Sequence, residues 1–105
     1  MKVKSNVKVG AAYYRQGRVE DAGRHFDRAL KAFETRVARG ADDPFTRYYI
    51  AGMLALRGDA ERAFEVLDKT AAMQPALTRS RAERDPDFDG LRQDPRFQQV
   101  LRAHV

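Results

Sequence analysis

The chain has 105 residues and a formal net charge of +5; this is the size of one domain, and we treat residues 1–105 as a single domain. It contains no cysteine, so a disulfide framework, a thiolate metal site and a thiol nucleophile are excluded. No apolar run approaches the length that crosses a membrane, and no apolar secretory signal follows the first residues, so we expect a cytoplasmic location.

The first two predicted elements form a helical hairpin. Ser5 or Asn6 is expected to cap a helix that ends near Gln16. Gly17 follows, and glycine accepts the positive φ with which a helix ends and the chain reverses. The next helix begins directly after this turn. Its apolar positions recur with helical spacing over so many turns that we expect it to end only near residues 39–40.

A second hairpin is predicted after a short loop. Asp43 is expected to cap its first helix and Pro44 to take the first helical position, because proline needs no hydrogen-bond partner there. Gly58 is the predicted turn of this hairpin. Asp59 is expected to cap the fourth helix, over residues 60–73.

The remaining tail is predicted to contain three short helical elements, over residues 76–84, 86–91 and 95–104. Asp85 and Asp94, each followed by proline, are expected to cap the last two. The apolar residues expected to be buried there are Phe88, Leu91, Phe97, Val100 and Leu101.

Aligning the two hairpins on their glycine turns places small residues on small ones and large residues on large ones. The aligned pairs are Gly10 with Ala51, Tyr13 with Leu54, Ala22 with Ala63, and Phe26 with Leu67. This order resembles the tetratricopeptide repeat over roughly residues 3–75. The pattern's tryptophan falls on Asn6 and Arg47, and the two turns are 41 residues apart instead of about 34.

The predicted fold class is therefore all-α, with antiparallel helix–turn–helix repeats in a tetratricopeptide-like α-solenoid of two units and a C-terminal capping helical tail. The units cover residues 3–40 and 44–75, and the tail covers residues 76–105. The tail resembles segments that end bacterial tetratricopeptide arrays. Two units are fewer than such arrays need. Three explanations for the small number of units are open: the tail serves as a third layer, the chain dimerises, or the chain is the C-terminal part of a longer protein. We favour the tail as the capping layer.

The resemblance implies a noncatalytic scaffold for protein–protein interaction, because in that family the first helix of each unit lines a concave groove that holds a peptide. The implied partner-binding residues are Lys4, Val7, Ala11, Tyr14, Phe45, Tyr48 and Gly52. The implied rim consists of Lys8, Arg15 and Arg47. Ala11 and Tyr49 occupy the places of the family's carboxylate-clamping asparagines, so such a clamp is not expected.

No catalytic residue, metal site or cofactor is predicted, and the chain is interpreted as nonenzymatic. The sharpest metal motif is DPDFDG at residues 85–90, which matches the first half of a calcium loop. Arg96 stands where that loop needs a bidentate glutamate, so the aspartates are interpreted as caps. His25 and His104 are too few and too distant for a zinc site, and His25 is expected on a solvated flank.

The positive charge is concentrated in residues 1–40, which hold ten Lys or Arg and four Asp or Glu residues. An alternative function is therefore binding of nucleic acid or another anionic partner by the basic first helix pair. Nucleic acid ranks below a protein or peptide partner, because no recognition element is present. A third alternative is a structural module that associates with itself, and no membrane partner is expected.

Overall fold

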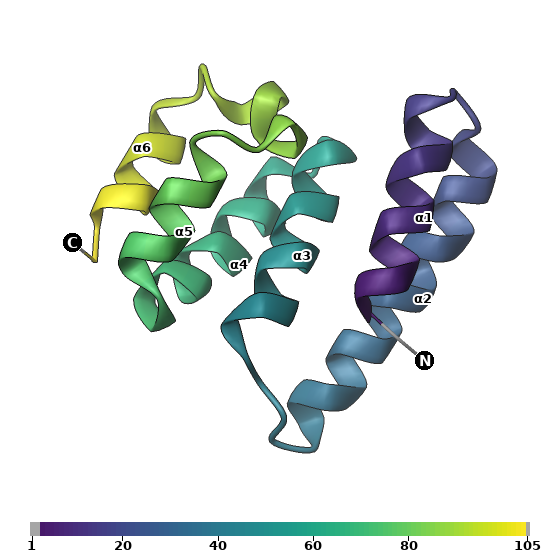
Figure 1. Cartoon of the computed structure of the whole chain (residues 1–105), viewed down its shortest axis with the longest axis horizontal. Coiled ribbons are helices and arrows are strands. Elements are labelled where there is room, and N and C mark those ends of the chain that lie inside the picture. Colours follow the sequence, from purple (N-terminus) through teal and green to yellow (C-terminus); the bar gives the residue numbers. More distant parts are fainter. Residues whose placement is uncertain (1–2, 105) are drawn as a thin grey trace. The chain divides into compact units, whose positions relative to one another are not determined.

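The computed structural model describes residues 3–104, which form helices and turns and contain no strand (Figure 1). The prediction of an all-α fold is confirmed. The helices are α1 (Val3–Arg15), α2 (Val19–Ala38), α3 (Pro44–Leu56), α4 (Ala60–Met73), α5 (Pro75–Ala82), the 3₁₀ helix η1 (Pro86–Leu91) and α6 (Pro95–Arg102). Backbone contacts divide the chain into two units, Met1–Ile50 and Ala51–Val105, and the division falls within α3.

In the first unit, α1 and α2 lie side by side as an antiparallel hairpin (Figure 1). Gly17 adopts a φ of +80° at the turn, as the sequence predicted, and the backbone N–H of Arg18 donates to the carbonyl of Tyr13 at 2.9 Å. Gly10 and Ala22 lie at the helix contact: a Cβ on Gly10 would come within 3.3 Å of the carbonyl oxygen of Ala22. The small residues thus let the two backbones approach closely.

The end of α2 and the start of α3 also follow the predicted boundaries. Gly40 has a φ of +82°, and the N–H of Ala41 donates to the carbonyl of Arg36 at 2.8 Å, which closes the last turn of α2. Asp43 caps α3, because its carboxylate accepts from the backbone N–H of Thr46 at 2.8 Å and from the hydroxyl of Thr46 at 2.9 Å. This cap was predicted from the Asp-Pro pair.

Within residues 3–50, two polar side chains are buried, and they occupy the aligned positions where the repeat pattern has tryptophan. Asn6 lies with its amide oxygen 3.2 Å from Nδ1 of His25. Arg47 forms a two-pronged ion pair with Asp42, and its guanidinium lies 5.5 Å from the centre of the Phe33 ring. At both positions where the repeat pattern has tryptophan, this chain therefore has a buried polar residue that is paired with another polar side chain.

In the second unit, α5 and α6 pack against α4 and against each other (Figure 1). Gly58 has a φ of +82° between α3 and α4, as predicted. Ala51, Ala63 and Leu67, the counterparts of Gly10, Ala22 and Phe26, are completely buried. The second hairpin therefore buries the same small and large positions as the first.

The tail supplies core residues to the second unit. Phe88 and Leu101 are completely buried, and Phe97 is 1% exposed, with its ring centre 5.8 Å from that of Phe88. Arg92 secures this segment: it donates to the carbonyls of Ala82 and Asp85 at 3.2 and 2.6 Å, and its guanidinium lies over the Phe97 ring. The predicted burial is confirmed, except that Val100 is only half-buried.

Two of the predicted helix caps were wrong. α1 already begins at Val3, so Ser5 and Asn6 lie inside the helix and do not cap it. The side chain of Asp59 makes no capping hydrogen bond and lies 3.8 Å from Arg62. The helix predicted around residues 76–84 is present as α5, Pro75–Ala82, with proline at its start.

Candidate functional site

The seven predicted groove residues differ in accessibility. Lys4 and Phe45 are exposed, and Tyr14 is half-buried, with its ring centre 6.4 Å from that of Phe26. The remaining four are buried: Val7, Ala11, Tyr48 and Gly52. Fewer of the predicted groove residues are therefore accessible to a partner than the sequence indicated.

Gly52, in the second unit, is covered by the tail. A Cβ on Gly52 would lie 3.5 Å from a carboxylate oxygen of Asp87 and 4.0 Å from the ring of Phe88. The sequence placed Gly52 on an open binding surface, but η1 occupies that space. This correction follows from the tail's role as a packing element, which brings Phe88 onto the glycine.

An aromatic and basic surface remains accessible in the first unit, formed by Lys4, Phe45 and Tyr49. Phe45 is 54% exposed and lies four residues, one helical turn, before Tyr49 on α3. The ammonium of Lys4 lies 5.5 Å from the centre of the Tyr49 ring, within the range of a cation–π interaction. The sequence placed Tyr49 at the position of a clamping asparagine, and Tyr49 was not predicted among the binding residues, although its spacing from Phe45 was the available signal.

The predicted basic rim is only partly present. Lys8 and Arg15 are exposed on α1. Arg47 is buried by its ion pair with Asp42 and its contact with Phe33, so it is a packing residue instead of a rim residue. The planar guanidinium suits this position, because it forms the two-pronged pair along one edge and faces an aromatic ring.

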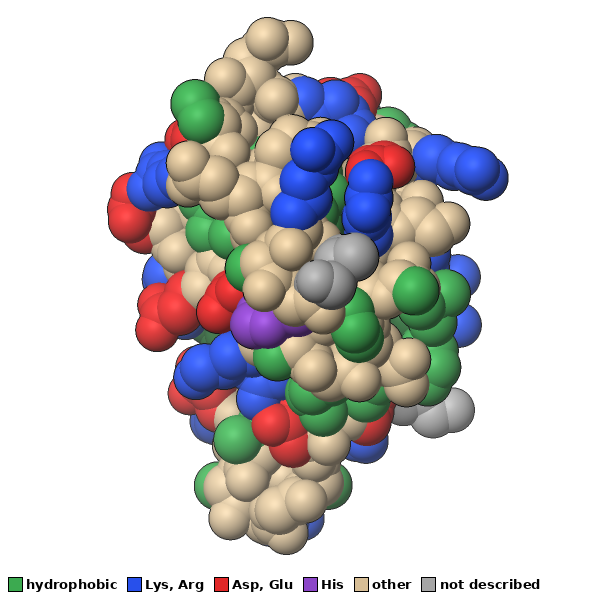
Figure 2. Space-filling model, turned by 90° about the vertical axis from the view of Figure 1, so that its left-hand side faces the viewer, with side chains coloured by type: hydrophobic (Ala, Val, Ile, Leu, Met, Phe, Trp, Pro, Cys, Tyr) green, Lys and Arg blue, Asp and Glu red, His purple; other side chains and the backbone are tan. Residues whose placement is uncertain are grey.

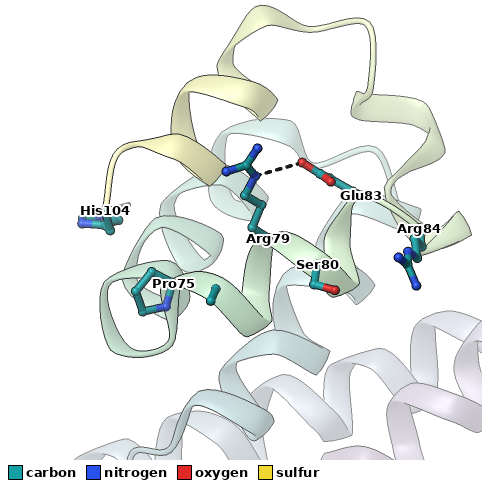
Figure 3. A pocket seen from close by; sticks show the side chains of 7 residues that line it. Pro75, Arg79, Ser80, Glu83, Arg84 and His104 are labelled. Carbon is teal, nitrogen blue, oxygen red and sulfur yellow. Dashed lines mark hydrogen bonds and ion pairs between the residues drawn. The ribbon is translucent and has the colours of Figure 1, made fainter.

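A surface hollow lies in the second unit, over the outer side of α5 (Figure 3). Figure 3 shows Arg79 pointing toward Glu83, with which it forms an ion pair at 3.2 Å. His104 lies at the opposite end of the hollow from Arg84, and its Nε2 is 2.9 Å from the Asp68 carboxylate. Arg79 and Glu83 are therefore engaged with each other, and His104 is engaged with Asp68, which does not line the hollow.

A second hollow, in the first unit, follows the outer face of α2. Its lining residues are Arg28, Lys31, Ala32, Thr35, Arg36 and Arg39. Four of the six are basic, which agrees with the excess of Lys and Arg in the first helix pair. On the face of the molecule that Figure 2 draws, by contrast, basic and acidic side chains are interspersed.

Three aspartates have lowered pKa values because of neighbouring arginines or hydrogen bonds. Partial burial raises the pKa of Asp43, but hydrogen bonds from Thr46 and Arg36 outweigh it and hold the pKa below its ordinary value. Hydrogen bonds from Arg18 lower the pKa of Asp21, and those from Arg96 lower the pKa of Asp94. All three lie at the N-terminal ends of helices, where the helix dipole stabilises a negative charge. A structural role therefore explains these charged carboxylates.

Asp85, the first aspartate of residues 85–90, acts as the cap that the sequence predicted. The carboxylate of Asp85 accepts from the backbone N–H of Asp87 at 3.0 Å, which is a cap. Arg96, at the place where a calcium loop needs an acid, contacts Asp94 and Glu61 and lies over the ring of Phe64 at 4.8 Å. Between residues 3 and 104, no group of three or more His, Asp or Glu residues is arranged to hold a metal ion.

The prediction of a solvated His25 was wrong. His25 is half-buried, its Nδ1 lies 3.2 Å from Asn6, and its ring centre lies 5.5 Å from that of Tyr13. The ring therefore joins α2 to α1. No helix in the part of the chain that the structure describes is long and apolar enough to span a membrane.

The described residues define an all-α protein whose first unit contains the α1–α2 hairpin and the first part of α3, and whose second unit includes a helical tail that packs on α4. No family model, curated protein or solved structure matches the chain. The interpretation of its function rests on the residues of the chain itself.

Proposed function

We propose that the chain is a noncatalytic protein–protein interaction module built from tetratricopeptide-like helical hairpins. In both hairpins, a glycine of positive φ is followed at the same spacing by a fully buried alanine and then by a buried large residue. The alanines are Ala22 and Ala63, and the large residues are Phe26 and Leu67. This recurrence supports the resemblance to a repeat whose members present helical surfaces to other proteins.

The observation that carries the proposed binding role is the exposure of Phe45. A phenylalanine ring that remains 54% exposed on a helix is a ready contact for an apolar side chain of a partner, and aromatic residues are enriched in protein interfaces. Tyr49 and Lys4 extend the same surface with a second ring and a positive charge. The proposed partner is a protein segment that covers Phe45 with an apolar side chain.

Photo-crosslinking in cells tests this proposal. A benzoylphenylalanine at position 45 is expected to capture a discrete protein species, which mass spectrometry identifies. Position 19 is the matched control, since Val19 is an apolar residue of the same unit that is 61% exposed. The captured protein is then expected to bind the purified wild-type chain, and the Phe45→Ala variant is expected to bind it more weakly. Equal capture from positions 45 and 19 would contradict the proposal.

A further inference from the structure

The outer face of α2 is a basic surface distinct from the Lys4, Phe45 and Tyr49 surface. The residues that line its hollow recur at helical spacing between Arg28 and Arg39, so they share one side of the helix. Among the residues that the structure describes, no acidic side chain forms an ion pair with Arg28, Lys31 or Arg39. These three side chains therefore have charge available for a ligand.

The charge of the whole chain is located in the unit that contains this face. Residues 1–50 hold eleven Lys or Arg against six Asp or Glu, whereas residues 51–105 hold nine of each. The formal net charge of +5 thus belongs to the first unit. Such a localised field raises the local concentration of anionic partners and speeds their association.

The fourth basic residue of the hollow already binds a carboxylate. Arg36 donates to Oδ2 of Asp43 at 3.0 Å, at the C-terminal end of the face. Guanidinium groups match the geometry of carboxylates as well as that of phosphates. The ion pair of Arg36 with Asp43 therefore shows that a basic residue of this face can bind a carboxylate.

The floor of the hollow is apolar. Ala32 lies half-buried between the basic side chains, and the hydroxyl of Thr35 donates to the carbonyl of Lys31 at 3.0 Å, which leaves the Thr35 methyl group for a ligand. The methylene stems of the basic residues add further apolar surface. A ligand that fills this hollow needs an apolar group between its negative charges.

These features favour a polypeptide over a nucleic acid. No aromatic side chain lines the hollow, so single-stranded bases have no ring on which to stack. Asp27 and Glu34 lie four residues before and three residues after Lys31, along one edge of the basic face. A duplex presents phosphates from two strands, and one strand would approach that acidic edge.

We propose that the outer face of α2 docks an acidic protein segment that carries an apolar side chain between its acidic residues. The distance along the helix from residue 28 to residue 39 is about 16 Å. An extended peptide covers that length with about five residues. The acidic residues contact Arg28, Lys31 and Arg39, and the apolar side chain lies over Ala32.

Fluorescence anisotropy at low salt tests this with two labelled twelve-residue peptides rich in glutamate, one with a central leucine and one with serine in its place. The leucine peptide is expected to bind about fivefold to tenfold more tightly, since burying its side chain adds favourable free energy. Lys31→Glu combined with Arg39→Glu is expected to weaken binding of the leucine peptide at least about tenfold. Lys69→Glu combined with Arg102→Glu makes the same charge change at two exposed positions of the second unit and is expected to have a smaller effect.

The same titration with mixed-sequence RNA and DNA distinguishes the alternative ligand. The proposal is overturned if nucleic acid of equal charge binds more tightly than the leucine peptide. It is also overturned if the two peptides bind equally, or if both double variants weaken binding to the same extent. The Phe45→Ala variant is expected to retain peptide binding, so failure here and failure of the Phe45 surface are distinguishable.

Discussion

Gly10 on α1 lies directly against the ring of Phe26 on α2: a Cβ at position 10 would be 2.6 Å from two ring carbons. Phe26 is 1% exposed, so its ring has little room to move. Gly10→Ala is therefore expected to destabilise the protein by about 1–3 kcal/mol through overpacking. Urea denaturation followed by circular dichroism measures this as a lower midpoint.

Gly23→Ala is the matched control for that substitution. Gly23 lies inside α2, and a Cβ there would meet no atom within 4 Å. Alanine is expected to stabilise the protein by about 0.5–1 kcal/mol, because it loses less conformational freedom in a helix than glycine does. If both variants shift the midpoint in the same direction, the close contact of Gly10 with Phe26 does not control stability.

The helices were predictable because their local signals agreed with their packing. Glycines at positions 17 and 58 have positive φ, and the caps at Asp43, Asp85 and Asp94, each followed by proline, accept backbone hydrogen bonds. Helical spacing of apolar residues predicted that α2 is long, although its last buried residue is Phe33 and Val37 is exposed, so the helix continues beyond its buried part. Asp59 occupies the N-cap position of α4, but its side chain makes no capping hydrogen bond. The residue type alone therefore does not predict that bond.

The site was less predictable because it depends on which faces are covered. Gly52 was expected to be open, but Phe88, thirty-six residues later, lies against it. The resemblance placed Arg47 on the rim of the groove, but Arg47 is buried, pairs with Asp42 and lies near the ring of Phe33. The contact of Gly52 with Phe88 joins positions far apart in the sequence, and the ion pair of Arg47 with Asp42 compensates a buried charge. Helical spacing of apolar residues predicts neither contact.

Arg47→Ala is expected to destabilise the protein by about 1–3 kcal/mol. The substitution removes the contact with Phe33 and leaves the partly buried carboxylate of Asp42 without its arginine. Arg47→Lys is expected to recover only part of the loss, because lysine lacks the planar fork. A double-mutant cycle with Asp42→Ala measures the coupling, and a coupling near zero would show that packing alone accounts for the effect.

Arg79→Ala is the control for an exposed pair. The side chains of Arg79 and Glu83 are 39% and 40% exposed, whereas that of Arg47 is only 10% exposed. Solvent screens the exposed pair, so its loss is expected to change the free energy of unfolding by less than about 1 kcal/mol.

Asp43 is expected to make stability depend on pH in the acid range. Its pKa in the folded protein is below the ordinary value of 3.8, so the folded state favours the charged carboxylate. The resulting stability is fully present above pH 3.8 and is lost as the pH falls through the lower, folded-state pKa. Asp43→Asn keeps a capping oxygen but does not titrate.

The free energies of unfolding of the wild type and Asp43→Asn are to be compared by urea denaturation between about pH 6 and pH 2. The advantage of the wild type is expected to be constant at the upper end and to shrink below pH 3.8. Asp21 and Asp94 are present in both proteins, so their titration cancels in the difference. An advantage that grows as the pH falls would contradict the assigned direction of the pKa shift.

Phe97→Ala tests whether the tail belongs to the core of the second unit. The ring is 1% exposed and packs against Phe88 and the guanidinium of Arg92, so its removal is expected to cost about 3–5 kcal/mol. Val100→Ala, on the same helix, removes a half-buried side chain and is expected to cost about 1 kcal/mol. If the tail were a loosely attached segment, both variants would unfold at the wild-type midpoint, because the α4 core would not depend on α6.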